Sequence, residues 1–248
     1  MLPDLTREEV AGSLDAVIEE ILAQVGLKQP PVDAFKVAQG LGITVARDDC
    51  QEGRARYVRL SNRRSSRPRA AILLRSDPRL ERRQWAVAHE LGEHAAHRVF
   101  AVLGVDPREA SPRAREQVAN QLAGRLLVPS HWFVKDAAAC AWDLLALKNR
   151  YRTASHELIA RRMLDCPPAV IITIIDQGRI TFRRGNLPGR TPPTTSAESA
   201  CWRSVHEQNK PQSLVFKMQT IQGWPIHEDQ WKREILRMEL NYISDLCL

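Results

Sequence analysis

Apolar residues recur at helical spacing near the start of the chain. A capping box at Thr6–Glu9 opens the first stretch, and Gly26 is placed to end it. The apolar stripe consists of Val10, Leu14, Val17, Ile18, Ile21 and Val25. After Pro30-Pro31, a second and shorter helix is predicted over residues 32–41. The chain is therefore expected to begin with two helices.

Short apolar runs follow, and their composition is typical of strands. They lie at residues 43–45, 55–60 and 70–74. The last two flank the Arg- and Ser-rich stretch 61–69, which predicts an antiparallel hairpin closed by that loop. Longer helical patterns come next, over residues 80–100, 114–128, 142–151 and 155–164.

Pro167-Pro168 marks a boundary, after which the pattern changes. A hairpin is expected from the apolar segments 170–175 and 179–183, and residues 185–199 are typical of a linker. A strand is predicted over residues 213–220. The stripe of a final helix is formed by Trp231, Ile235, Met238 and Tyr242.

These elements predict an α+β fold with two parts. Residues 1–166 are expected to form one domain, which includes the helix pair 142–164, and residues 167–248 a small α+β region without an assigned role. The first domain is expected to pack a small antiparallel sheet on a helix bundle. With 44% apolar and 26% charged residues, the chain has the composition of a soluble globular protein.

Features of a membrane or secreted protein are missing from the sequence. The longest apolar run, Ala169–Ile175, is far shorter than the ~20 residues of a membrane span, and the first ten residues do not resemble a secretory signal. The five Cys are scattered and odd in number, which favours reduced thiols over a disulfide framework. We therefore expect a cytoplasmic protein without a membrane partner.

The net charge of +7 is concentrated in one segment. Residues Arg54–Arg83 hold eleven Arg and two acidic residues, a net charge of +9, so the rest of the chain carries −2. A cationic patch of this kind favours an anionic partner, of which nucleic acid is the usual example. A solvated, Arg-rich surface is the alternative interpretation of the same charge.

The segment Trp85–His97 contains the pattern with the clearest chemistry. It begins like the zincin helix, in which two ligands one turn apart flank a Glu that acts as general base. His89 is the first predicted ligand and Glu90 the general base. Side chains at i and i+4 lie about 40° apart on a helix, so both can reach one ion.

The second ligand is left with two candidates. Glu93 stands at i+4 from His89, whereas His94 points about 140° away from it in a regular helix and would need a π-bulge. Helix geometry favours Glu93, and His94 remains the alternative. A ligand set with one imidazole and two carboxylates suits Zn²⁺, and Mn²⁺ or Fe²⁺ almost as well.

The third ligand is expected on the next helix. Glu116 shares a face with Ala119, Asn120 and Ala123, and the small Ala residues allow the two helices to approach closely. Asn120, one turn beyond Glu116, is placed to hydrogen-bond a metal ligand. A solvated surface Glu is the alternative reading for Glu116.

Three motifs together resemble the ImmA/IrrE family of zincin-like metallopeptidases. They are Ala88-His-Glu-Leu-Gly92, Glu116-x-x-Ala-Asn120-x-x-Ala123 and Leu126-Leu-Val-Pro129, and the resemblance covers about residues 10–165. The family often carries a further His eight residues after the first, and His97 stands at that offset. Like Asn120, His97 is expected to support the ligands. This register puts Glu93 at the family's usual second-His position, which is the one important departure.

The resemblance implies a site-specific protease that cleaves a helix-turn-helix repressor and so switches a stress-response operon or a mobile element. Two alternatives are kept. Glu93 motivates a non-catalytic regulator that binds a repressor, whereas the Arg segment and the helix pair 142–164 motivate a nucleic-acid-binding regulator on a degenerate peptidase scaffold. The Arg segment is hypothesised to face an acidic part of the substrate or a nucleic acid, with an edge strand holding the substrate by β-addition. The residues proposed to test this patch are Arg63, Arg64, Arg67 and Arg69.

Overall fold

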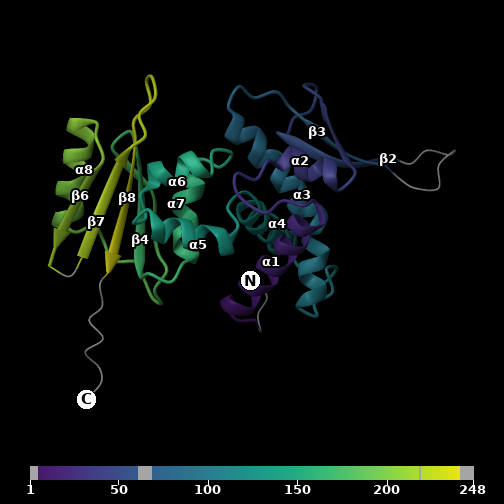
Figure 1. Cartoon of the computed structure of the whole chain (residues 1–248), viewed down its shortest axis with the longest axis horizontal. Coiled ribbons are helices and arrows are strands. Elements are labelled where there is room, and N and C mark those ends of the chain that lie inside the picture. Colours follow the sequence, from purple (N-terminus) through teal and green to yellow (C-terminus); the bar gives the residue numbers. More distant parts are fainter. Residues whose placement is uncertain (1–4, 61–68, 218, 241–248) are drawn as a thin grey trace, which may run out of the picture. The chain divides into compact units, whose positions relative to one another are not determined.

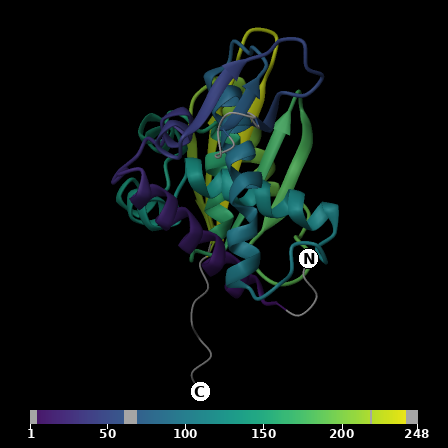
Figure 2. The same ribbon diagram turned by 90° about the vertical axis from the view of Figure 1, so that its right-hand side faces the viewer.

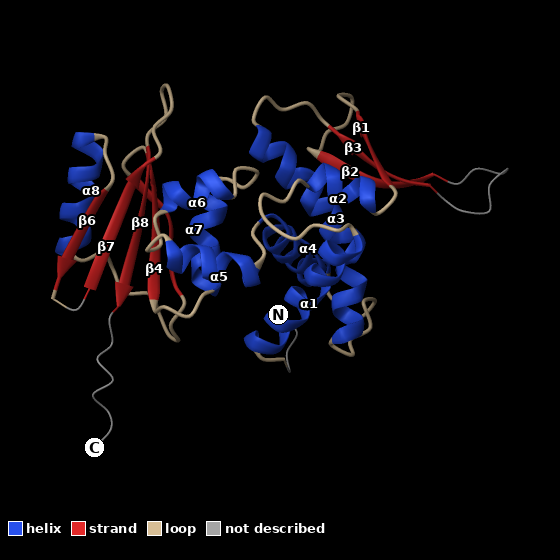
Figure 3. Ribbon diagram, viewed as in Figure 1, coloured by secondary structure: helices blue, strands red, loops and turns tan. Residues whose placement is uncertain are grey.

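The computed structural model describes residues 5–60, 69–217 and 219–240. These residues form α-helices and two separate β-sheets, so the predicted α+β class is confirmed (Figures 1 and 3). Contacts divide the chain into two compact units, Met1–Asp136 with Arg150–Ser155, and Ala137–Asn149 with His156–Leu248. The domain boundary expected after residue 166 remains a prediction. Within the described residues, no helix is both long and apolar enough to cross a membrane.

The first unit pairs a helical bundle with a small sheet. Its elements are α1 (Arg7–Gln24), α2 (Ala34–Gly40), β1 (Ile43–Arg47), β2 (Ala55–Leu60), β3 (Arg69–Leu74), α3 (Leu80–Val102) and α4 (Pro112–Leu127). Thr6 forms the predicted capping box with Glu9, because the side chain of each accepts a backbone N–H of the other. Helix α5 (Ser130–Ala139) follows α4.

The sheet of the first unit has the order β1-β3-β2 and is mixed. The predicted hairpin is confirmed, since β2 and β3 pair antiparallel, from Ala55 opposite Leu74 to Leu60 opposite Arg69. A wholly antiparallel sheet was the wrong expectation, because β1 runs parallel to β3. The chain passes through β2 between these two strands, which allows β1 and β3 to point the same way. Because β3 lies in the middle of the order, β2 is an edge strand.

The second unit is built on an antiparallel sheet with the order β5-β4-β8-β7-β6. The hairpin of β4 and β5 is seen as paired green arrows in Figure 2. The elements of this unit are α6 (Leu144–Arg150), α7 (His156–Arg162), the 3₁₀-helix Met163–Asp165, β4 (Val170–Asp176), β5 (Arg179–Gly185), α8 (Ser196–Gln208), β6 (Gln212–Phe216), β7 (Gln219–Pro225) and β8 (Arg233–Leu240). Helix α8 packs on β6, β7 and β8.

The predicted final helix over Trp231–Tyr242 is wrong. Arg233–Leu240 is a strand, β8, hydrogen-bonded on both sides between β4 and β7. A central strand buries both of its faces, so the two-residue alternation that identifies a strand is lost. The buried Glu234 and Arg237 interrupt the apolar run and produce an apparent helical stripe. Tyr242 lies outside the described residues.

Candidate metal centre

Helices α3 and α4, which lie side by side in Figure 1, touch at the level of their backbones. A Cβ atom added to Gly92 of α3 would lie 2.4 Å from the carbonyl oxygen of Ala119 on α4. Ala88 and Ala123 are completely buried. Small residues on both helices therefore bring the faces that carry the predicted ligands together, as the spacing of the Ala residues predicted.

Gly92→Ala is expected to destabilise the protein by about 1–3 kcal/mol, because an added methyl group must displace the rigid backbone of Ala119. Denaturant unfolding of the metal-free protein measures this change. Gly12→Ala is the matched control, since Gly12 lies in α1 with nothing within 4 Å of its added Cβ. The control is expected to gain about 0.5–1 kcal/mol of helix stability. Equal effects of the two substitutions would contradict the packing argument.

Three of the predicted ligands meet on this interface. His89 Nε2 lies 3.6 Å from Glu93 Oε1 and 3.7 Å from Glu116 Oε2, and one ligand atom from each residue lies within 4.8 Å of the others. The His89 side chain is 18% exposed, whereas the two carboxylates are about half exposed. The group thus has a part-buried imidazole at its base and opens toward solvent on its carboxylate side.

Asn120 connects two of these residues. Its Nδ2 donates to Glu116 Oε1 at 2.9 Å, and because a carboxylate can only accept, the amide oxygen must face the other way. That oxygen accepts from His89 Nδ1 at 3.1 Å. His89 Nδ1 is therefore the donor in this hydrogen bond, and Nε2 is the ring nitrogen that faces the two carboxylates.

Asn120→Ala is expected to weaken metal binding about 10–100-fold, because both His89 and Glu116 lose the contact that orients them. A competition titration against a zinc chelator measures the affinity. Gln121→Ala, at the exposed neighbouring position of α4, is the control and should leave it unchanged. An unaltered affinity in the Asn120 variant would show that the ligands are oriented without it.

Glu90 lies deeper than the three ligands and is 7% exposed. Its Oε2 accepts the backbone N–H of Tyr57 from β2 at 2.7 Å. Burial raises the pKa of Glu90, the hydrogen bond from Tyr57 partly opposes this, and the charge of Glu93 adds to the rise. A carboxyl group with a raised pKa is suited to take up a proton and to release it again. Sequence reasoning missed Tyr57, because its partner is the peptide N–H of a strand and no side-chain pattern reports it.

His94 and His97 lie together, outside the group of three ligands. The His94 ring packs on Tyr57, with ring centroids 5.1 Å apart, and lies edge-on to His97. His97 Nδ1 is 2.8 Å from the His94 carbonyl oxygen. Burial lowers the pKa of His94, and the nearby His97 and Arg59 lower it further. An open hollow of about 550 Å³ is lined by the rings of Tyr57, His94 and His97 together with Arg59 and Glu93.

The structure thus gathers some of the predicted site residues and separates others. Helix α3 is regular throughout, so Glu93 rather than His94 is grouped with His89 and Glu116. Asn120 contacts two of these predicted ligands, while His97 contacts His94. The assignments of these residues as ligands, as general base and as supporting groups remain predictions.

The donor set fits a divalent transition metal. One imidazole nitrogen and two carboxylate oxygens that converge from two helices are ligands that zinc accepts. Replacement of an imidazole by the Glu93 carboxylate makes the set harder, so manganese(II) or iron(II) would fit nearly as well. The exposed carboxylate side leaves room for a water molecule or a substrate oxygen.

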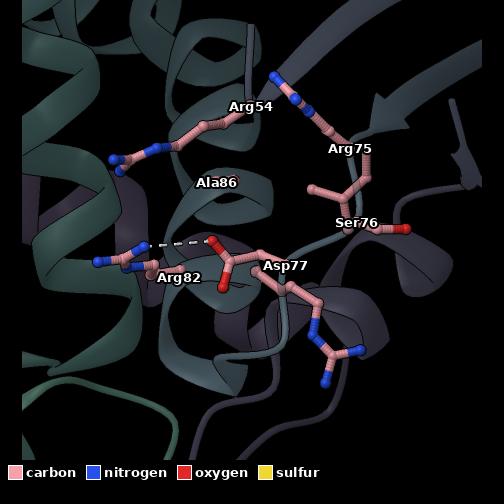
Figure 4. Close-up of a pocket in the computed structure, with 8 residues that line it drawn as sticks. Arg54, Arg75, Ser76, Asp77, Arg82 and Ala86 are labelled. Carbon is pink, nitrogen blue, oxygen red and sulfur yellow. Dashed lines mark ion pairs between the residues drawn. The ribbon is translucent and has the colours of Figure 1, made fainter. Parts of the chain in front are cut away.

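Part of the Arg segment surrounds a second hollow. Arg54, Arg75, Arg82 and Arg83 line a space of about 270 Å³ at the start of α3 (Figure 4). The one acidic side chain among its lining residues, Asp77, lies 3.6 Å from Arg82. Of the four Arg proposed to test this patch, Arg63, Arg64 and Arg67 lie outside the described residues, and only the backbone of Arg69 is described.

Comparison with known proteins supports the interpretation of the region that contains α3 and α4. Residues 38–164 match the profile of the IrrE N-terminal-like domain, a peptidase family. A solved structure described as a Mycobacterium tuberculosis transcriptional regulator is similar in fold, with a TM-score of 0.67 and 17% sequence identity. The match covers 93% of this chain and 76% of that one. No curated protein matches the chain.

Proposed function

Because the chain belongs to the peptidase family of IrrE N-terminal-like domains, we propose that it is a metal-dependent endopeptidase. The proposed substrate is a protein regulator, a helix-turn-helix transcriptional repressor, whose cleavage switches a stress response or a mobile element. One observation carries the proposal. His89, Glu93 and Glu116 converge on one point between α3 and α4, beside the buried carboxyl group of Glu90.

Zinc is the proposed cofactor, with manganese(II) or iron(II) as the alternatives. His89, Glu93 and Glu116 would hold it, and the bound ion would supply the polarisation of the scissile carbonyl and the acidification of a water molecule. Glu90 would take up the proton of the attacking water and deliver it to the leaving amine. Its hydrogen bond to the Tyr57 N–H fixes the direction in which the carboxyl group points.

The open edge of β2 offers a place for an extended substrate. The Arg54 carbonyl accepts the N–H of Arg75. Arg54 and every second residue after it therefore direct their backbone N–H and C=O groups toward β3. The backbone N–H and C=O groups of Tyr57 and Arg59 therefore point away from β3, toward the open edge. The hydrogen bond from the Tyr57 N–H to Glu90 agrees with this direction. A substrate strand added at this edge would lie next to Glu90 and beside the hollow lined by His94.

Metal removal tests the proposal. The protein stripped with a chelator is expected to lose cleavage of its proposed helix-turn-helix repressor substrate, and added zinc is expected to restore that cleavage. His89→Ala with Glu116→Ala should abolish the restoration, while His131→Ala, at a part-exposed His of α5, should not. Cleavage by the stripped protein, or full restoration in the double variant, would refute a metal-dependent peptidase at this site.

A second candidate function rests on the Arg-lined hollow. Arg54, Arg75, Arg82 and Arg83 place four guanidinium groups around one space, and the buried Nε of Arg83 makes no hydrogen bond in the described structure. We propose that an anionic partner, nucleic acid, binds there. Such binding should fall steeply with salt and decrease in Arg54→Ser with Arg75→Ser. Salt-insensitive binding, or no binding, would indicate that these residues form only a solvated surface.

A further inference from the structure

The second unit brings together two His and one Glu from separate segments. His206 lies near the end of α8, His227 follows β7, and Glu234 is the second residue of β8. Strands β7 and β8 pair with Pro225 opposite Glu234, so His227 is only two residues beyond that pair. Helix α8 packs on the same two strands, which places His206 over the end of the hairpin.

The two imidazoles converge on one carboxylate oxygen. Glu234 Oε1 lies 2.8 Å from His206 Nδ1 and 2.7 Å from His227 Nε2. The rings are steeply inclined, at 71°, with centroids 6.0 Å apart. One ligand atom from each of the three residues lies within 4.8 Å of the others. The ligand atoms of His89, Glu93 and Glu116 lie within the same distance of one another.

The cluster is buried at Glu234 and accessible to solvent at His206. Glu234 is completely buried, His227 is 14% exposed, and His206 is 36% exposed. The other oxygen of Glu234 accepts the indole N–H of Trp202, one turn before His206 on α8, at 3.1 Å. A hydrogen bond of this kind to a ligating carboxylate fixes its orientation, as in established metal sites.

We propose that His206, His227 and Glu234 form a second metal site, which takes a divalent transition metal and prefers zinc. Two imidazoles and one carboxylate form a known zinc ligand set, and the exposed side toward His206 leaves a fourth position for water. Two nitrogen donors disfavour magnesium and calcium, which take oxygen ligands. A bound ion would connect α8, the segment after β7 and the buried start of β8, so it would stabilise the second unit.

The test separates this site from the one between α3 and α4. Full-length protein carrying His89→Ala and Glu116→Ala is expected to bind one zinc per chain in a chelator competition. Cobalt(II) should give the visible absorption of a four-coordinate site, and excess zinc should raise the melting temperature. These readouts do not depend on peptidase activity. The proposal of a second metal site can therefore be refuted while the proposed peptidase function stands, and the peptidase function can be refuted while the second site stands.

Variants of the two His decide the assignment. In the same background, His227→Ala and His206→Gln should each abolish the cobalt spectrum and the zinc-dependent rise in melting temperature. Both keep the buried Glu234, and circular dichroism shows whether they are folded. His131→Ala, at a part-exposed His outside the cluster, should leave both signals unchanged. No zinc binding in the background protein, or undiminished binding in folded His227→Ala, would show that the three residues form only a hydrogen-bonded network.

Discussion

Glu90→Gln is expected to leave the proposed first metal site filled and to slow cleavage of the proposed repressor substrate about 10²–10⁴-fold, the contribution of a positioned general base. Glutamine keeps an oxygen that can accept the Tyr57 N–H, so the local fold should persist. Burial disfavours the charged form of Glu90, and a neutral amide removes that cost. The loss of activity should therefore come without a loss of stability.

Single-turnover cleavage and bound metal are measured on the same preparation. Glu109→Gln, which removes a carboxylate from an exposed position beyond α3, should behave like the unmodified protein in both assays. Cleavage by Glu90→Gln at the unmodified rate would refute the role of Glu90. Loss of metal together with activity would instead place Glu90 among the ligands.

The local part of the site could be predicted from the sequence, because helix geometry alone relates His89 to Glu93. The contact with Glu116 depends on the packing of α3 against α4, for which the small residues Ala119 and Ala123 were the sequence signal. The bond from the Tyr57 N–H to Glu90 depends on where an edge strand lies beside a helix. No pattern of residue types encodes that position.

The second unit was predicted less well, for related physical reasons. Strand β8 was taken for a helix because its buried Glu234 and Arg237 obscured a strand that is covered on both faces. This error also hid the convergence of His206, His227 and Glu234, which needs the pairing of β7 with β8. Helix α8 was missed although Thr195 and Glu198 form a capping box, because the preceding Pro- and Thr-rich stretch suggested a linker.

That capping box leads to a buried ion pair on which the second unit depends. Glu198 is completely buried, and its Oε1 and Oε2 accept from Arg183 of β5 at 2.7 and 3.1 Å. Arg183 also donates to the carbonyl oxygens of Pro192 and Pro193 and to the Thr173 hydroxyl. One guanidinium group therefore holds the loop before α8, the start of α8 and the sheet together.

Glu198→Ala is expected to destabilise the second unit by about 3–5 kcal/mol, because Arg183 is left as a largely buried charge without its carboxylate. Thr195 loses its side of the capping box as well, since its backbone N–H donates to Glu198 Oε2. Thermal and denaturant unfolding, followed by tryptophan fluorescence to which the buried Trp224 contributes, measure the loss.

A double variant distinguishes the charge from the packing. Glu198→Met with Arg183→Met replaces both partners by apolar side chains, and a buried ion pair replaced in this way often costs little stability. We expect the double variant to recover much of what Glu198→Ala loses, although the loop carbonyls of Pro192 and Pro193 still lose their donor. If the double variant were as unstable as Glu198→Ala, the loss would come from the loop and the cap. The buried charge of Arg183 would then not be its cause.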